Sequence, residues 1–166
     1  MVKPMSIVFT DHEIAQLVQE PKPLPDDYRA RLGFRDKRGH REASLDVAGQ
    51  GGHGFRIIVR QSTHNPLDFS AILAVEVPGT NRLFRLRRYN SRTHPHTNRI
   101  ERETFLYRPH IHQATARYQD LGVDEEEYAE VTDLYSTVDE ALQCMFRDCG
   151  FILPDSTDIG LFEEMT

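Results

Sequence analysis

Four stretches in the first half of the chain have patterns that are typical of strands. Apolar and polar residues alternate in some of them, and residues 71–75 form an uninterrupted apolar run of strand length. The predicted strands span residues 43–47, 55–61, 69–77 and 83–89. Clusters of Gly, Pro, Asn and Asp separate them, and these residues favour tight turns. Short connections between successive strands predict an antiparallel meander.

Helical patterns flank the predicted strands. Thr10 followed by Glu13 matches a capping box, and an apolar stripe with helical spacing comes directly after it. Thr137 and Glu140 begin a second such pattern near the C-terminus. A further helix is expected near residues 111–120.

These elements predict one α+β domain, and a chain of 166 residues is long enough to bury one hydrophobic core. The expected fold is an antiparallel β-meander of about four to five strands packed by N-terminal and C-terminal helices. Its parts are an N-terminal helix and Pro-rich segment (1–28), the meander (29–90), a His/Arg segment (91–120) and an acidic helical C-terminal part (121–166).

Alternation within the fourth predicted strand divides its side chains between two faces. Phe84 and Leu86 are expected to point to the core. Arg85, Arg87 and Tyr89 are expected to point to the opposite face. This strand would therefore have one apolar and one cationic face.

The charge of the chain is unevenly distributed along it. The formal net charge is −6, but residues 82–117 hold nine arginines and two glutamates, a net charge of +7. Residues 118–166 hold fourteen acids and one arginine, a net charge of −13. The acidic part could shield the basic segment electrostatically, or it could be a solvated face.

The composition is that of a globular protein, and the longest apolar runs are of strand length, so no membrane span is expected. The N-terminus has no apolar segment of the kind found in export signals. Cys144 and Cys149 are expected to be core thiols on one helix, too badly placed for a disulfide. A reducing, cytoplasmic compartment fits these features.

Four of the eight histidines form two His-x-His pairs within the basic segment: His94 with His96, and His110 with His112. Imidazole titrates near neutral pH, so a pair can supply a base and an acid together. RNA carries its own nucleophile, the 2′-hydroxyl, so a metal-independent nuclease needs only a base, an acid and a cation. The sequence therefore favours a small endoribonuclease that acts on RNA or another phosphate-bearing substrate.

The roles in such a site follow from residue type. His110 and His112 are the leading base and acid, with His94 and His96 as alternates, and Tyr89 could donate a proton or stack on a base. Guanidinium groups bind phosphate oxygens in a bidentate manner. The candidate phosphate-binding residues are Arg88, Arg108, Arg85 and Arg92.

Two other functions fit the same segment, and the histidines could also be structural or solvated. His94, His96, His110 and His112 could together bind a divalent metal such as Zn, in a hydrolase or a binding module. The many arginines nearby would repel a cation, and no cofactor is expected under the nuclease hypothesis. Alternatively, the basic face could dock an acidic or nucleic-acid partner without catalysis.

Two short motifs resemble those of the TumE-like toxins of bacterial toxin–antitoxin pairs. They are the run Arg88-Tyr89-Asn90 and the run Pro109-His110-Ile111-His112, separated by a loop that contains histidine. The resemblance implies a cytosolic toxin or defence protein that acts on RNA and is held by a cognate antitoxin. It points to Arg88, Tyr89, His110 and His112, although the chain is longer at both ends than a minimal toxin.

Overall fold

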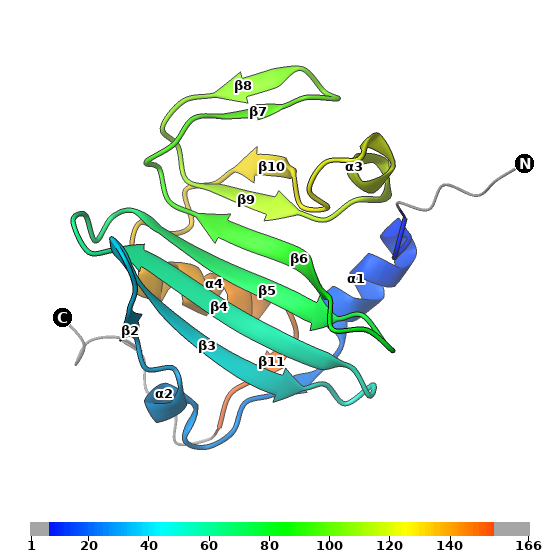
Figure 1. Cartoon of the computed structure of the whole chain (residues 1–166), viewed down its shortest axis with the longest axis vertical. Coiled ribbons are helices and arrows are strands. Elements are labelled where there is room, and N and C mark those ends of the chain that lie inside the picture. The colour runs from blue at the N-terminus through cyan, green and yellow to red at the C-terminus, as the bar shows by residue number, and fades with distance from the viewer. Residues whose placement is uncertain (1–6, 155–166) are drawn as a thin grey trace, which may run out of the picture.

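The computed structural model describes residues 7–154 and is built around a seven-stranded antiparallel sheet (Figure 1). The strand order is β10-β9-β6-β5-β4-β3-β2. The strands are β2 (Arg35–Asp36), β3 (His40–Ala48), β4 (Gly54–Ser62), β5 (Phe69–Glu76), β6 (Leu83–Asn90), β9 (His110–Gln113) and β10 (Tyr128–Val131). Two small pairs lie outside this sheet: parallel β1 (Lys22–Pro23) with β11 (Phe151–Ile152), and antiparallel β7 (His96–Asn98) with β8 (Glu103–Phe105).

The predicted α+β class and antiparallel meander are confirmed, because β3 to β6 pair in sequence order. The number of strands in the main sheet is larger than expected. The four helices are α1 (Asp11–Gln19), α2 (Tyr28–Arg31), α3 (Ala116–Leu121) and α4 (Val138–Asp148). None of the described helices is long and apolar enough to cross a membrane.

The helix predicted near residues 111–120 is wrong in its first part. Residues 110–113 form β9, which lies between β6 and β10, and α3 begins only at Ala116. The alternating burial of β9 is the pattern of a strand. Pairing with a strand on each side outweighs the local helical tendency of this segment.

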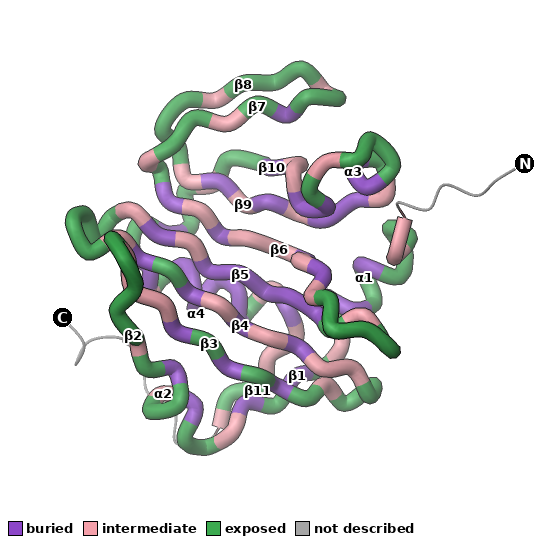
Figure 2. The backbone as a smooth tube through the Cα atoms, in the orientation of Figure 1, coloured by how far each residue is buried: buried purple, intermediate pink, exposed green. Residues whose placement is uncertain are grey.

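One face of the sheet carries the core. Helix α4 lies against β5 and β6, and α1 contacts β6 from the same side (Figure 1). Buried positions alternate with more exposed ones along β3 and β4 (Figure 2). In β4, Phe55, Ile57 and Val59 join the core, whereas Arg56 points to the other side, which we call the open face.

A β-bulge in β6 changes which side chains reach the open face. Leu73 pairs with Arg87 and Ala74 pairs with Arg85, so Leu86 is an extra residue in β6. Beyond it the alternation reverses, and Tyr89 is fully buried in the core. The prediction that Tyr89 and Arg87 share a face with Arg85 is therefore wrong.

Both predicted capping boxes are present. The Thr10 and Thr137 side chains accept hydrogen bonds from the backbone N–H groups of Glu13 and Glu140, and both glutamates bond back to the cap residues. The two helices therefore begin where the sequence indicates.

Cys144 and Cys149 are buried free thiols, as expected.

Lys22 is a fully buried charged residue that joins the ends of α1 and α4. Its ammonium group lies 2.7–2.9 Å from the carbonyl oxygens of Leu17, Val18, Glu20 and Cys149. Burial lowers the pKa of Lys22 to about 8, so the group is still mainly protonated at neutral pH. It supplies donors to carbonyls that helix ends leave without an intrahelical partner.

Replacing Lys22 by Met should lower the free energy of unfolding by about 2–4 kcal/mol, because several buried carbonyl oxygens lose their donor. Urea denaturation of the two proteins measures this difference. Lys37→Met, which removes a charge from an exposed turn residue, is the matched control and should change stability by less than about 0.5 kcal/mol. Equal effects of the two substitutions would contradict the role given to Lys22.

Candidate functional site

The pairing of β6 with β9 places cationic and imidazole side chains together on the open face. Arg88 pairs with His112, and Asn90 pairs with His110. Directly paired residues project to the same side of a sheet. His110 and His112 are buried, with exposed fractions of 1% and 5%.

The β7–β8 hairpin brings a third histidine to this pair. The ring of His96 lies 5.6 Å from that of His110 and 4.7 Å from that of His112, and the last two rings are 5.0 Å apart. Phe105 of β8 contacts the rings of His96 and His110 at 5.4 and 5.2 Å. We call His96, His110 and His112 the imidazole cluster.

His94 lies outside this cluster. Its side chain is 68% exposed and approaches Asp68 at 3.4 Å. Three of the four candidate histidines therefore converge, and the fourth occupies the surface near them.

The hairpin is fixed to the sheet by a side-chain amide. The buried Asn98 donates to the carbonyl of Ala129 at 2.7 Å and accepts from its N–H group at 2.9 Å. These two bonds continue the pairing pattern of β10 at its free edge. A third bond, 2.9 Å long, joins Asn98 Oδ1 to His96 Nε2.

Hydrogen bonds determine the tautomer of each imidazole in the cluster. Nδ1 of His110 lies 2.7 Å from the carbonyl of Arg108, and Nδ1 of His112 lies 2.8 Å from that of Glu126. A carbonyl only accepts, so these nitrogens donate. Asn98 Oδ1 likewise accepts from Nε2 of His96. In its neutral form, each of the three rings therefore has one nitrogen that donates and one with a free lone pair.

The surroundings of His110 and His112 favour their neutral forms. Burial lowers the pKa of His110, and Arg88 and the other histidines lower it further. Burial, followed by the charge of Arg88, lowers the pKa of His112 to about 3. The arginine that acts on both rings, Arg88, is itself paired with the carboxylate of Glu126 at 2.7 Å.

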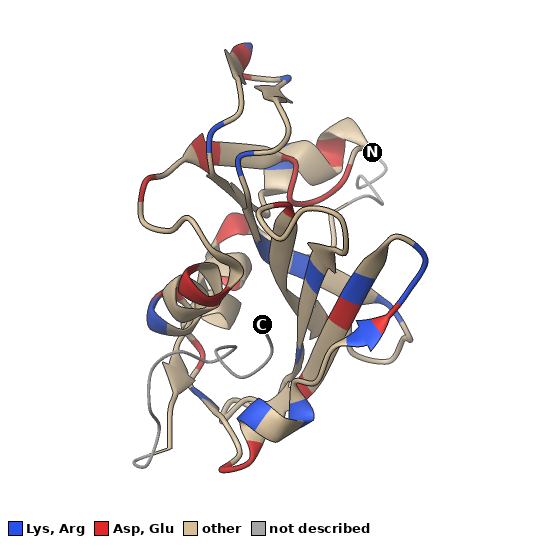
Figure 3. Ribbon diagram, turned by 90° about the vertical axis from the view of Figure 1, so that its left-hand side faces the viewer, with Lys and Arg blue, Asp and Glu red and all other residues tan. Residues whose placement is uncertain are grey.

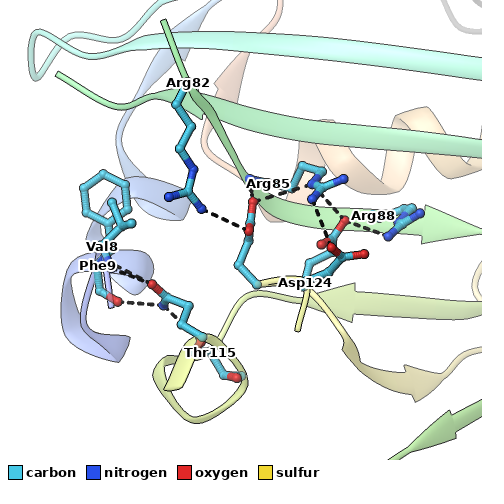
Figure 4. Close-up of polar contacts among 10 residues, drawn as sticks. Val8, Phe9, Arg82, Arg85, Arg88, Thr115 and Asp124 are labelled. Carbon is cyan, nitrogen blue, oxygen red and sulfur yellow. Dashed lines mark hydrogen bonds and ion pairs between the residues drawn. The ribbon is translucent and has the colours of Figure 1, made fainter. Parts of the chain in front are cut away.

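Arg88 is held by the acidic segment that precedes β10. It donates to Glu126 at 2.7 Å, and Arg85 approaches the same carboxylate at 3.3 Å (Figure 4). Glu126 is fully buried, and this burial raises its pKa despite the two arginines. Its carbonyl also accepts from His112, so one residue positions both the cation and an imidazole.

The acidic part of the chain neutralises much of the basic strand. Asp124 and Glu125 also pair with Arg85, and Glu125 reaches Arg82. Positive and negative residues are interspersed over the sheet in Figure 3 rather than separated into two surfaces. The open face is therefore less cationic than the sequence alone indicates. The hypothesis that this face binds an acidic or nucleic-acid partner without catalysis stays a prediction.

Two polar atoms within this network have no hydrogen-bond partner among residues 7–154. Nε of Arg88 and Oε1 of Glu126 are both buried and unpaired. Unsatisfied buried groups are uncommon in proteins and are often explained by a bound water or ligand. They lie in the ion pair that adjoins the imidazole cluster.

The remaining candidate residues have different surroundings. Tyr89 points to the helices, where its hydroxyl donates to Asp148 at 2.9 Å, and burial raises its pKa. It is therefore separated from the cluster by the sheet. Arg92 and Arg108 are exposed on loops, and neither pairs with a carboxylate within residues 7–154.

Three residues of the site escaped the sequence analysis: Asn98, Phe105 and Glu126. The change from a basic to an acidic segment was a signal for Glu126, but it did not single out one carboxylate among many. Nothing local marks Asn98 or Phe105, because their roles depend on where the hairpin folds.

A metal ion at the imidazole cluster stays a prediction. No group of three or more His, Cys, Asp or Glu side chains in the described part of the chain is placed to hold a metal ion. His96, His110 and His112, whose rings lie 4.7–5.6 Å apart, are the residues that would bind one.

Comparisons with protein-family models, curated proteins and solved structures found no match for this chain. The similarity to TumE-like toxins therefore depends on two short motifs. The function has to be inferred from the geometry of the site.

Protonation of His112 should destabilise the fold. Its pKa of about 3 lies below the ordinary value of 6.5, so between these values the unfolded chain binds a proton that the native state does not. The contribution of neutral His112 to the free energy of unfolding is complete above pH 6.5 and is lost as the pH falls towards 3. The free energy of unfolding should fall by up to about 1.4 kcal/mol per pH unit in this range.

Urea denaturation between pH 7 and pH 4 measures this dependence. His112→Asn keeps an N–H group near the Glu126 carbonyl but does not titrate, so its stability should fall less steeply than that of the wild type. If the free energy of unfolding changed with pH in the same way in both proteins, the lowered pKa of His112 would be contradicted.

Proposed function

We propose that this protein is a metal-independent endoribonuclease whose active site is the imidazole cluster with Arg88. The observation that carries the proposal is the convergence of His96, His110 and His112 beside a guanidinium, with ring separations of 4.7–5.6 Å. This set contains the base, the acid and the cation that cleavage by the 2′-hydroxyl requires.

The hydrogen bonds suggest a division of roles. His110 is neutral, and its Nδ1 is tied to a carbonyl, so Nε2 is free to accept the proton of the 2′-hydroxyl. The 2′-oxygen then bonds to phosphorus while the bond from phosphorus to the 5′-oxygen breaks. His96, the most exposed of the three, donates a proton to that leaving oxygen.

Arg88 and His112 act on the charge of the phosphate. Arg88 would stabilise the additional negative charge of the transition state. An approaching phosphate also raises the pKa of nearby imidazoles, because an opposite charge favours their protonated form.

Access to the cluster depends on the β7–β8 hairpin. His110 and His112 are almost completely buried, while His96 and the exposed His94 lie towards the solvent. Outward displacement of the hairpin, which is held by Asn98 and by ring contacts, would open a path to the buried nitrogens.

The TumE-like motifs support a toxin that is inhibited by an antitoxin.

RNA cleavage in EDTA tests this proposal. Wild-type protein should degrade total RNA without added metal, and His110→Ala should reduce the rate at least about 100-fold, as expected for loss of a general base. His64→Ala removes an exposed histidine from a loop outside the cluster and should retain activity. If wild type and His110→Ala leave RNA equally intact under native folding conditions, the protein is not this nuclease.

A bound divalent metal is the second candidate. Each imidazole of the cluster has one nitrogen fixed by an oxygen acceptor and one free lone pair, which is the arrangement of metal-bound histidines. Elemental analysis of protein purified without a His tag should find less than about a tenth of an equivalent of Zn, Mn, Fe or Ni. Stoichiometric metal would favour this candidate over the nuclease.

A further inference from the structure

A small hollow lies at one end of the sheet, beside the imidazole cluster. It has a volume of about 230 Å³ and lies among the loops that connect β4 to β5, β6 to β7, β8 to β9, and β10 to α4. Leu67, Arg92, Arg108 and Tyr135 come from these four loops and line it. Arg92 and Arg108 were candidate phosphate-binding residues of the nuclease, but no role has been given to the interior of this hollow.

The interior of the hollow is apolar and aromatic. Phe69 and Tyr135 are buried, and their rings lie 6.2 Å apart. Leu67 and Pro109 add apolar surface, and the serine and threonine residues of the lining are Ser91, Thr132 and Ser136. The Tyr135 hydroxyl donates to the carbonyls of Asn90 and His110 at 2.7 and 3.0 Å. These bonds hold the ring in place and connect it to the strands of the cluster.

The rim of the hollow is cationic. Arg92 and Arg108 are exposed, and no carboxylate within residues 7–154 pairs with either. Asp133 is the one acidic residue of the lining, so the described charges at the hollow sum to +1. An apolar interior with unpaired guanidiniums at its entrance fits a flat ring attached to an anion.

The rim is close to the proposed catalytic residues. Arg108 is two residues before His110, so their Cα atoms are at most about 7 Å apart. The Arg108 carbonyl also accepts from His110 Nδ1 at 2.7 Å. Arg108 therefore connects the rim to His110 along the backbone, while the aromatic lining of the hollow lies beside Tyr89 on the core side of the sheet.

We propose that this hollow is a nucleotide subsite, in which a base occupies the apolar interior and its phosphate binds Arg92 and Arg108. The inference rests on the proposed nuclease function and names the part of the RNA that the protein holds. Sites that enclose a whole drug-sized ligand measure roughly 300–1,000 Å³, and this hollow is smaller. It has room for one ring system, with the sugar and phosphate outside it.

Calorimetric titration of the intact protein with 5′-AMP, 5′-CMP, ribose 5-phosphate and inorganic phosphate tests the subsite. At least one nucleotide should bind about tenfold or more tightly than the two probes that lack a base, because only nucleotides reach the aromatic interior. Equal affinity for nucleotide and inorganic phosphate would overturn the inference, as would the absence of any nucleotide binding.

Paired variants locate the bound nucleotide. Arg108→Ala and Leu67→Asp should each weaken nucleotide binding at least about tenfold. Arg99→Ala and Leu121→Asp, which change exposed residues outside the lining, should change it less than about twofold. Circular dichroism confirms that each variant is folded, and equal losses in the two sets would place the nucleotide elsewhere.

The subsite and the nuclease can fail separately. RNA cleavage that depends on His110, without nucleotide binding in the hollow, would retain the proposed function and reject the subsite. Nucleotide binding that depends on Arg108, without any cleavage, would retain the subsite and reject the nuclease.

Discussion

The extra residue in β6 sets which side chains of this strand face the helices and which reach the open face. In a regular strand, Arg88 would point to the same side as Phe84 and Leu86. The bulge at Leu86 reverses the alternation, so that Arg88 reaches the open face and Tyr89 enters the core. β-bulges often redirect side chains near active sites, and this one places Arg88 beside His112.

Once Arg88 is on the open face, its charge has to be compensated in a mostly buried setting. Glu126 provides this through a 2.7 Å ion pair, and its backbone carbonyl accepts from His112. A buried carboxylate is costly unless it is paired, so this residue, Arg88 and Arg85 depend on one another. The same ion pairs reduce the net positive charge of the open face.

The proposed catalytic site and the proposed nucleotide subsite share one structural connection. His110 belongs to the cluster, its carbonyl accepts from Tyr135 in the hollow, and Arg108 links the two through the preceding loop. The hairpin that carries His96 is attached mainly by polar bonds and ring contacts. Such a boundary is easier to open than the packed helical face, where the core of the protein lies.

Local signals in the sequence were sufficient for the four meander strands, both capping boxes and the two buried thiols, because each depends on residues close together in the chain. The clustering of His and Arg in the sequence also pointed to the segment that contains the imidazole cluster. Only the tertiary structure decided that β9 is a strand, that His96 rather than His94 joins His110 and His112, and that Tyr89 faces away. These features depend on a bulge, on strand pairing across about twenty residues and on the position of a hairpin, and no local pattern of side chains specifies them.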